Sequence, residues 1–153
     1  MKLLIDKEIL ESWRMALIEA KQNEVGGILF GEHIDNEEFR LVEFTIQKKQ
    51  GNKASFRRKA NEARKSLKNL SKAYGNEHAQ FNYLGEWHSH PNSLAIPSEM
   101  DIETMHSILN DKSTVANFLV LMILKVNHDS FIEMSAITFL ASGHEIECQI
   151  EIT

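Results

Sequence analysis

The sequence predicts an α/β domain in which helices flank a mixed, mostly antiparallel sheet. Patterns typical of strands and helices follow one another along the 153 residues in the order strand, helix, strand, strand, helix, strand, helix and further strands. A continuous apolar run at residues 115–126 has the length and β-branched content of a buried central strand. No repeat, low-complexity tract or linker divides the chain, so residues 1–153 are expected to form a single domain. By pattern alone, an unrelated α+β domain is the alternative.

The first third of the chain predicts a strand, a helix and a pair of strands. Residues 2–5 suit a short strand, and Asp6 is a typical N-cap for a helix that extends to about residue 21. A strand with two adjacent glycines is expected at 24–31, and alternating apolar residues predict a return strand at 38–47. Apolar residues recur on the helix at helical spacing and predict a stripe facing the core, made of Ile9, Leu10, Trp13, Leu17 and Ala20.

The remaining segments continue the alternation of strands and helices. Helical patterns and turn residues separate short runs of β-branched and aromatic residues. Besides the central strand, the expected elements are a helix at about 59–74, a strand at 81–88, a helix from 99 to about 110, and strands at 132–140 and 145–152.

The composition excludes several classes of protein. With 42% hydrophobic residues, 25% charged residues and two prolines, the chain is globular rather than collagenous or largely disordered. Cys148 is the single cysteine, so no disulfide framework is possible, and a small buried hydrophobe is the favoured interpretation over a nucleophile. The N-terminal apolar run is too short for a signal peptide, and the longest one falls far short of the roughly 20 residues that cross a bilayer. A cytoplasmic protein that contacts no membrane is expected.

Residues 48–72 differ from the rest in charge. Ten basic residues face Glu62 alone, a net charge of +9 within a chain of −5. The default interpretation is a solvated helix face with a loop, and the alternative is a docking surface for an acidic partner or substrate. Nucleic acid is disfavoured because no aromatic residues interleave with the charges. Neutralising Arg57, Arg58 and Lys59 together is expected to weaken substrate cleavage more at low salt than at high salt. The basic residues are Lys48, Lys49, Lys53, Arg57, Arg58, Lys59, Arg64, Lys65, Lys68 and Lys72.

One stretch, YLGEWHSHPNSLAIPSEMD at residues 83–101, carries the strongest chemical signal. In an extended strand His88 and His90 project from the same face. Ser98 is expected to cap the following helix, which puts Asp101 on its first turn. Each residue alone is more often structural, and Ser-x-x-Asp is often only a capping box. Together, two imidazoles and a carboxylate that converge with one position left open are typical of a catalytic zinc site.

These residues resemble a known family. HSHP followed by six residues and Ser-x-x-Asp resembles the signature of the JAMM (JAB1/MPN/Mov34) zinc metalloproteases, and Glu24 in NEVGGILFG matches the upstream glutamate of that signature. The string YLGEWHSHP resembles the bacterial branch found in CBASS anti-phage operons, beside an E1–E2-like protein and a cGAS-like nucleotidyltransferase (CD-NTase). The resemblance extends over about residues 6–139 and is sharpest at 24–31 and 83–101.

The resemblance implies a fold, an activity and a role for each residue. It implies a three-layer JAMM/MPN fold with a core similar to that of cytidine deaminases, and one Zn²⁺ per chain held by His88, His90 and Asp101. It implies that Glu24 is the general base and that Ser98 donates a hydrogen bond to the oxyanion. The implied activity is that of an isopeptidase that releases a ubiquitin-like C-terminal linkage from a target lysine, or processes such a precursor. The CBASS branch implies that the conjugated protein is the CD-NTase, through its C-terminal tail.

Other functions were weighed against this one. The domain could process a sulfur-carrier or other ubiquitin-like protein, or act as a phage-tail peptidoglycan peptidase, although no cell-wall module accompanies it. A non-catalytic MPN scaffold is disfavoured because every signature residue is present. A zinc deaminase is disfavoured because no Cys-x-x-Cys accompanies the histidines. The histidines without partners at ligand spacing are His33, His78, His128 and His144, and His106 does not share the helix face of Asp101.

Overall fold

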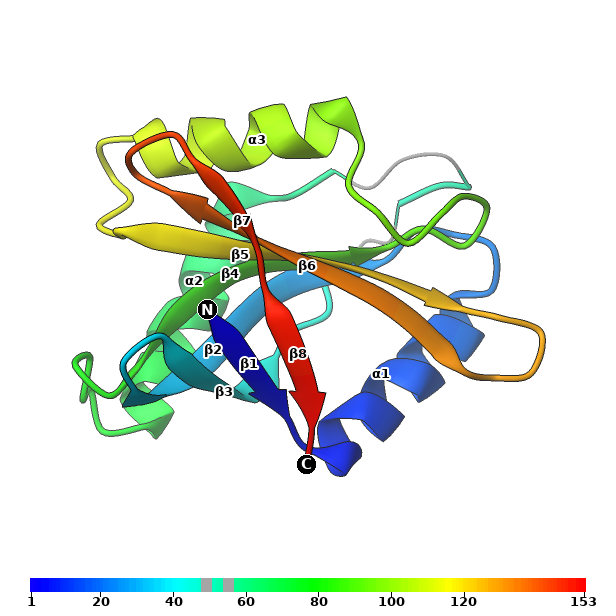
Figure 1. The fold of residues 1–153 in the computed structure, drawn as a ribbon, viewed down its shortest axis with the longest axis horizontal. Coiled ribbons are helices and arrows are strands. Elements are labelled where there is room, and N and C mark those ends of the chain that lie inside the picture. The colour runs from blue at the N-terminus through cyan, green and yellow to red at the C-terminus, as the bar shows by residue number, and fades with distance from the viewer. Residues whose placement is uncertain (48–50, 54–56) are drawn as a thin grey trace.

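Within the part of the chain that the computed structural model describes, residues 1–47, 51–53 and 57–153, eight strands form one sheet with helices on both of its faces (Figure 1). The order of elements is the predicted one. They are β1 (Lys2–Ile5), α1 (Lys7–Ala20), β2 (Gly26–Asp35), β3 (Glu38–Phe44), α2 (Ala60–Ala73), β4 (Phe81–Ser89), α3 (Glu99–Asn110), β5 (Phe118–Val126), β6 (Ile132–Leu140), β7 (Glu145–Glu147) and β8 (Gln149–Ile152).

The sheet is mixed, as predicted. Its strand order is β7-β6-β5-β4-β2-β3-β1-β8, in which the pairs β1–β3, β1–β8 and β4–β5 are parallel and the other pairs are antiparallel. The expectation of one strand at 145–152 is wrong, because the chain leaves β6 at Cys148 and continues along β1, at the other end of the sheet. The buried Cys148 donates its backbone N–H to Ala136 at 2.9 Å, which holds this crossing against the core.

Strand β5 separates two hydrophobic clusters by simple alternation of its side chains. Leu119, Leu121 and Ile123 pack with Met105 of α3 and Phe139 of β6. The alternate residues face the stripe of α1, in a cluster that includes Trp13, Leu17, Ala20, Val120, Met122 and Leu124. The prediction of a buried central strand is therefore confirmed, but the strand begins at Phe118 because Val115 is 98% exposed.

The helices form the outer two layers of a three-layer arrangement. In Figure 1, α1 and α3 lie on opposite sides of the sheet. Helix α2 lies on the same side as α3, since Ala63 and Leu67 of α2 line one cavity with Tyr83 of β4 and Ile108 of α3. The predicted three-layer fold is confirmed. No helix in the described ranges is long and apolar enough to span a membrane.

The hairpin of β2 and β3 differs from its predicted bounds. Strand β2 continues to Asp35 because its pairing with β3 extends beyond the apolar residues to Glu38. Strand β3 ends at Phe44, but Thr45 and Gln47 still donate backbone hydrogen bonds to Ile28 (3.0 Å) and Gly26 (2.8 Å). The return segment therefore remains tied to β2 up to the point where β2 begins.

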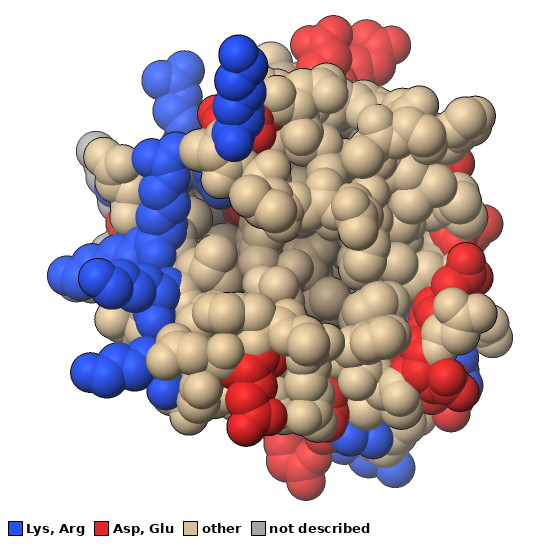
Figure 2. All heavy atoms as spheres, turned by 90° about the vertical axis from the view of Figure 1, so that its left-hand side faces the viewer, with Lys and Arg blue, Asp and Glu red and all other residues tan. Residues whose placement is uncertain are grey.

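Basic residues gather over α2, as the sequence predicts for a solvated helix face. Figure 2 shows Lys and Arg side chains along one edge of a largely uncharged face that is hollowed at its centre. The predicted Lys48 and Lys49 lie outside the described residues. The basic residues within α2 are Arg64, Lys65, Lys68 and Lys72.

Candidate metal centre

The C-terminal end of β4 carries both histidines. His88 and His90 are buried, with 7% and 8% of their surfaces exposed. Between them, Ser89 faces the other way: its hydroxyl accepts a hydrogen bond from the backbone N–H of Val25 at 3.0 Å, and its own N–H donates to the carbonyl of Val25 at 2.8 Å. The N–H of His90 donates to Leu124 of β5 at 2.9 Å, which extends the strand geometry past Ser89. Both imidazoles therefore project from one face, as predicted.

Asp101 reaches the same point from the first turn of α3. Ser98 is the N-cap, and a capping box is complete: the Asp101 N–H donates to the Ser98 hydroxyl at 3.2 Å, and the Ser98 N–H donates to Asp101 Oδ2 at 2.7 Å. The Ser98 hydroxyl also donates to Oδ2 at 2.7 Å. The cap thereby fixes the direction of the Asp101 carboxylate.

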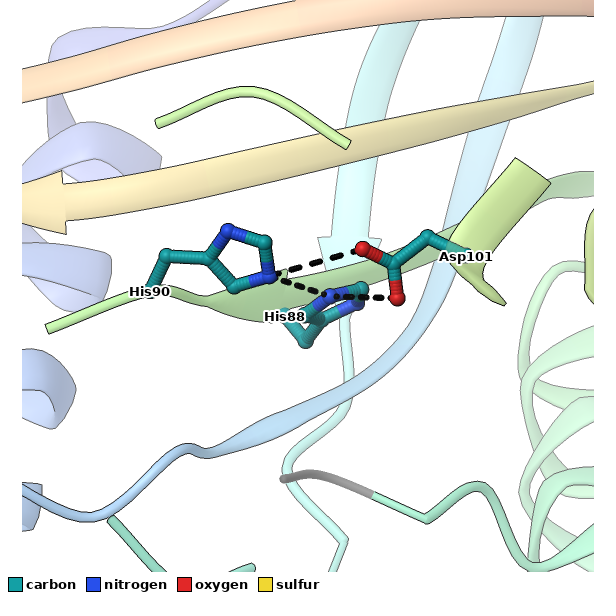
Figure 3. Close-up of side chains that lie close together, drawn as sticks. All are labelled: His88, His90 and Asp101. Atoms are coloured by element: carbon teal, nitrogen blue, oxygen red, sulfur yellow. Dashed lines mark hydrogen bonds and ion pairs between the residues drawn. The ribbon is translucent and has the colours of Figure 1, made fainter. Parts of the chain in front are cut away.

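The three side chains meet with a spacing that fits a metal ion (Figure 3). His88 Nε2 lies 3.0 Å from His90 Nε2 and 3.2 Å from Asp101 Oδ1, and His90 Nε2 lies 3.5 Å from Asp101 Oδ2. Ligand atoms about 2.0 Å from a tetrahedral ion stand about 3.3 Å apart. Among the described residues these are the one group of three potential ligands whose ligand atoms lie within 4.8 Å of one another. The group is positioned to bind a metal ion.

A backbone carbonyl selects the tautomer of His90. Nδ1 of His90 lies 3.1 Å from the carbonyl oxygen of Leu94. Since a carbonyl only accepts, a hydrogen bond here requires the proton on Nδ1, which leaves the lone pair of a neutral ring on Nε2. That lone pair faces His88 and Asp101. A hydrogen bond from the non-ligating nitrogen is the usual support of a metal-binding histidine.

The electrostatics keep the carboxylate ionised. Burial alone would raise the pKa of Asp101, but hydrogen bonds with His88 and His90 lower it well below its usual range. In return, a hydrogen bond to Asp101 raises the pKa of His90, because a protonated ring donates from Nε2 to Asp101 as well as from Nδ1 to Leu94, and the charge of Glu24 adds to this effect. Asp101 therefore stays ionised, and its negative charge favours a cation between the three side chains.

Glu24 lies beside the histidines without joining the group of three. It is 8% exposed and precedes β2 by two residues. Its N–H donates to the carbonyl of Asn52 at 2.9 Å, and its carbonyl accepts from the N–H of Gly51 at 2.8 Å. The negative charge of Glu24 contributes to the raised pKa of His90. Sequence reasoning gave no sign of Gly51 and Asn52, which pair with Glu24 across more than 25 residues of chain.

Of the two adjacent glycines, Gly26 allows β2 to pack closely against β4. Gly26 pairs with His88, and a Cβ on Gly26 would lie 2.4 Å from the Trp87 carbonyl oxygen and 2.7 Å from the His88 Cβ. Only glycine allows this approach of β2 to β4. The close contact places the start of β2, which Glu24 precedes by two residues, beside His88.

The family is shown by comparison with known proteins. Residues 6–136 match the family model described as prokaryotic homologs of the JAB domain. The chain belongs to this family of prokaryotic JAB domains. The family includes metalloisopeptidases, and a JAB domain can also be non-catalytic. No curated protein matches the sequence.

Two solved structures share the fold of this JAB domain. The solution structure of protein DSY2949 from Desulfitobacterium hafniense superposes with a TM-score of 0.69 at 19% identity, over 99% of this chain and 92% of that one. The crystal structure of AF2198, a JAB1/MPN domain protein from Archaeoglobus fulgidus, superposes with a TM-score of 0.51 at 15% identity, over 98% of each chain. At these identities the likeness extends to the fold alone.

A cleft opens from the metal centre of the JAB domain. It has a volume of about 730 Å³ and runs between α3 and residues 57–58, with His88 and Asp101 at one end. Its remaining lining residues are Glu86, Trp87, Met100, Glu103, Thr104, Met105, Ser107, Ile108 and Leu121.

Sequence reasoning missed an ion pair on the floor of this cleft. Glu86 precedes His88 by two residues, is 6% exposed, and accepts hydrogen bonds from Arg58 Nε at 2.6 Å and from the hydroxyl of Tyr83. The available signal was a carboxylate within the otherwise apolar stretch YLGEWH, since a buried charge requires a partner. His106, by contrast, bonds to Glu145 at 2.8 Å, away from the metal centre.

Proposed function

We propose that this JAB domain is a zinc-dependent isopeptidase that hydrolyses the linkage between a ubiquitin-like C-terminus and a target lysine, or processes such a precursor. The observation that carries the proposal is the convergence of His88, His90 and Asp101 beside Glu24. Hydrolysis adds water across the isopeptide bond and yields a C-terminal carboxylate and a free lysine amine. That reaction needs a bound metal, a proton carrier and a donor for the oxyanion.

The ligand set favours zinc. Two neutral imidazoles and one carboxylate are a common catalytic set and leave a coordination position open. The chemistry that zinc supplies at such a site is the activation of water near neutral pH and the polarisation of the scissile carbonyl. His88 and His90 would hold the ion through Nε2, and Asp101 would offer Oδ1, because Oδ2 already accepts two hydrogen bonds from Ser98.

Glu24 is the proposed proton carrier. A carboxylate that stands near the ligands without belonging to their group can accept a proton from the attacking water and deliver it to the leaving lysine amine. The backbone bonds with Gly51 and Asn52, together with the close approach at Gly26, keep Glu24 in this position. A fixed backbone limits the positions open to the carboxylate, which lowers the entropy lost when it acts.

Ser98 is the proposed oxyanion donor. Its hydroxyl hydrogen points at Asp101 Oδ2 and would have to turn toward the substrate. This rotation of the hydroxyl should not displace the Asp101 carboxylate, since the Ser98 backbone N–H continues to bond the same oxygen at 2.7 Å. Asp101 can thus remain aligned while the hydroxyl changes partner.

For the substrate, we propose the conjugated CD-NTase of a CBASS operon. The support is the resemblance of YLGEWHSHP to that branch of the family, together with the intact ligand set. Precursors of sulfur-carrier proteins and other ubiquitin-like proteins are the alternative substrates, to be compared with it in the same cleavage assay.

The test combines metal analysis with cleavage. The wild type purified without added metal should contain about one zinc per chain, retained in Glu24→Gln and lost in His88→Ala and Asp101→Ala. His106→Ala, outside the centre, is the matched histidine control and should keep its zinc. On a glycine–lysine isopeptide conjugate, Glu24→Gln should lose about 10²–10⁴-fold in rate, and a chelator should stop the wild type. Absence of zinc even after it is offered would favour a non-catalytic scaffold, and near-normal cleavage by Glu24→Gln would refute the role of Glu24.

A further inference from the structure

Residues 57–59, of which Arg57 and Arg58 line one wall of the cleft, are held by the buried side chain of Gln47. Gln47 is 8% exposed, its Nε2 donates to the carbonyl of Arg57 at 2.9 Å, and its Oε1 accepts from the N–H of Lys59 at 2.7 Å. The Gln47 backbone is itself bonded to Gly26 at the start of β2. The segment is therefore fixed relative to the strands that carry the metal centre.

Arg58 within this segment serves the fold. Its Nε bonds to the buried Glu86 carboxylate at 2.6 Å, and its side chain is 25% exposed. A guanidinium neutralised in this way cannot also attract an acidic partner at full strength. Arg57, Arg58 and Lys59 are therefore not equivalent, because Arg58 anchors the wall to β4.

The ion pair of Arg58 with Glu86 leaves the neighbouring Arg57 as a cation that faces the cleft. It is exposed, lines the cleft, and forms no ion pair with any carboxylate of the described residues. On the opposite wall α3 contributes Glu103. An acidic side chain in the cleft is therefore repelled from the α3 wall and attracted to the wall of Arg57. A guanidinium also suits a carboxylate by bidentate geometry.

The basic residues of α2 belong to another surface. Arg64 bonds to Ser113 at 3.1 Å and lines a separate cavity with Tyr83 and Asp111. The ridge of basic side chains over α2 borders the hollowed face of Figure 2. Among the described basic residues, those of α2 thus form a ridge, whereas Arg57 and the paired Arg58 line the cleft of the candidate metal centre.

We propose that Arg57 is a specificity determinant that binds an acidic side chain of the substrate, in the peptide segment that lies in the cleft next to the scissile bond. This inference rests on the proposed isopeptidase function. It names the chemistry that the substrate must offer, an Asp or Glu close to the cleaved linkage, and assigns its recognition to one residue.

The test uses fluorogenic glycine–lysine isopeptides with Glu, Gln or Lys at each of about four positions on either side of the linkage. In an extended peptide each position adds about 3.3 Å, so this series samples the length of the cleft on both sides of the scissile bond. The wild type should prefer Glu over Gln at one position by about tenfold in kcat/KM, the size expected of a charge-assisted hydrogen bond. Arg57→Glu should reverse the preference in favour of Lys. Lys68→Glu, the same charge change on α2, should leave the preference unchanged.

A binding assay separates the two proposals. Zinc-loaded Glu24→Gln protein should bind the Glu peptide more tightly than the Gln peptide in fluorescence anisotropy, and the additional Arg57→Gln change should abolish the difference. Cleavage of all peptides at equal rates would overturn the role of Arg57 and leave the isopeptidase function standing. If no peptide were cleaved, the isopeptidase function would fail. The anisotropy measurement would then decide on Arg57 alone, and equal binding of the two peptides would overturn it.

Discussion

Ser98 donates two hydrogen bonds to the same carboxylate oxygen of Asp101, one from its backbone N–H and one from its hydroxyl, each 2.7 Å long. The other oxygen, Oδ1, faces His88 Nε2 at 3.2 Å. The helix cap of α3 and the metal centre therefore share one carboxylate, and fraying of the first helical turn would remove a ligand.

Ser98→Ala should weaken both functions of this cap. Loss of the hydroxyl should lower the free energy of unfolding by about 1 kcal/mol. Zinc affinity should fall by about tenfold, at the low end for a lost supporting bond, because the backbone N–H still orients Asp101. Urea unfolding and competition with a chromophoric chelator measure the two effects.

The matched control is Ser113→Ala. Ser113 donates to Asp111 Oδ1 through its N–H at 2.7 Å and its hydroxyl at 2.6 Å, at the far end of α3. Its removal should leave zinc affinity unchanged. Equal zinc affinity in wild type and Ser98→Ala would contradict the proposed coupling of cap and metal centre.

Gly26→Ala should damage the centre through the backbone. The new Cβ would meet the Trp87 carbonyl oxygen at 2.4 Å and the His88 Cβ at 2.7 Å, so β2 and β4 must separate. We expect a loss of about 2 kcal/mol in stability and weaker zinc binding, since His88 shifts. Thermal unfolding of the apoprotein and zinc titration provide the measurements.

Gly143→Ala is the control that separates the steric clash at Gly26 from the backbone strain of replacing a glycine with positive φ. Gly143 has φ +90° in the β6–β7 turn, and a Cβ there meets no atom within 4 Å. This variant should lose about 1 kcal/mol from backbone strain and bind zinc normally. If the two variants bound zinc equally, the close approach would not be what positions His88.

The local elements could be predicted from the sequence because their signals are local. Asp6 and Ser98 precede their helices, and the apolar run of β5 identifies the buried strand. The convergence of His88, His90 and Asp101 was also predictable, since strand alternation aligns His88 with His90 and the capping box orients Asp101.

The rest depends on contacts between distant parts of the chain. The crossing at Cys148 follows from pairing of β8 with β1, whose residues are almost the full chain length apart. Arg58 and Glu86 are 28 residues apart, and within the basic run nothing distinguishes Arg58 from Arg57. No periodicity in sequence encodes such partners, so they appear only once the sheet is assembled.

Replacing Glu86 should destabilise the protein by an amount that depends on whether the new side chain can still accept a hydrogen bond from Arg58. Glu86→Ala leaves Arg58 without its carboxylate at a cleft floor that is largely shielded from water. We expect a loss of about 2 kcal/mol, below the range for fully buried pairs because Arg58 is 25% exposed. Glu86→Gln keeps an acceptor for Arg58 and Tyr83 and should lose less.

A double-mutant cycle with Arg58→Met checks this expectation. Urea unfolding of both single variants and the double variant should give a favourable coupling between the two side chains. The double variant should be more stable than Glu86→Ala alone, because no unpaired charge remains. Strict additivity would show that the ion pair does not anchor residues 57–59.

Tyr83 should make the stability fall with pH in the alkaline range. Burial, together with the neighbouring Glu86 carboxylate, raises the pKa of Tyr83 far above its usual value, and Arg58 opposes this only in part. In the unfolded chain Tyr83 ionises near pH 10. Because the folded pKa is the higher one, the stability that Tyr83 contributes is fully present below about pH 10 and is lost as the pH rises beyond it.

Two measurements test this predicted loss of stability at alkaline pH. In a spectrophotometric titration of the native protein, which has two tyrosines, Tyr74 should ionise first, and Tyr83 should ionise only as the protein unfolds. Tyr83→Phe lacks the hydroxyl that bonds to Glu86 and should be less stable at neutral pH by about 1 kcal/mol. Above pH 10 the difference in stability from the wild type should shrink, because the variant has no proton to lose at this position. A gap that stayed constant with pH would mean that the Tyr83 hydroxyl is solvated rather than held by Glu86.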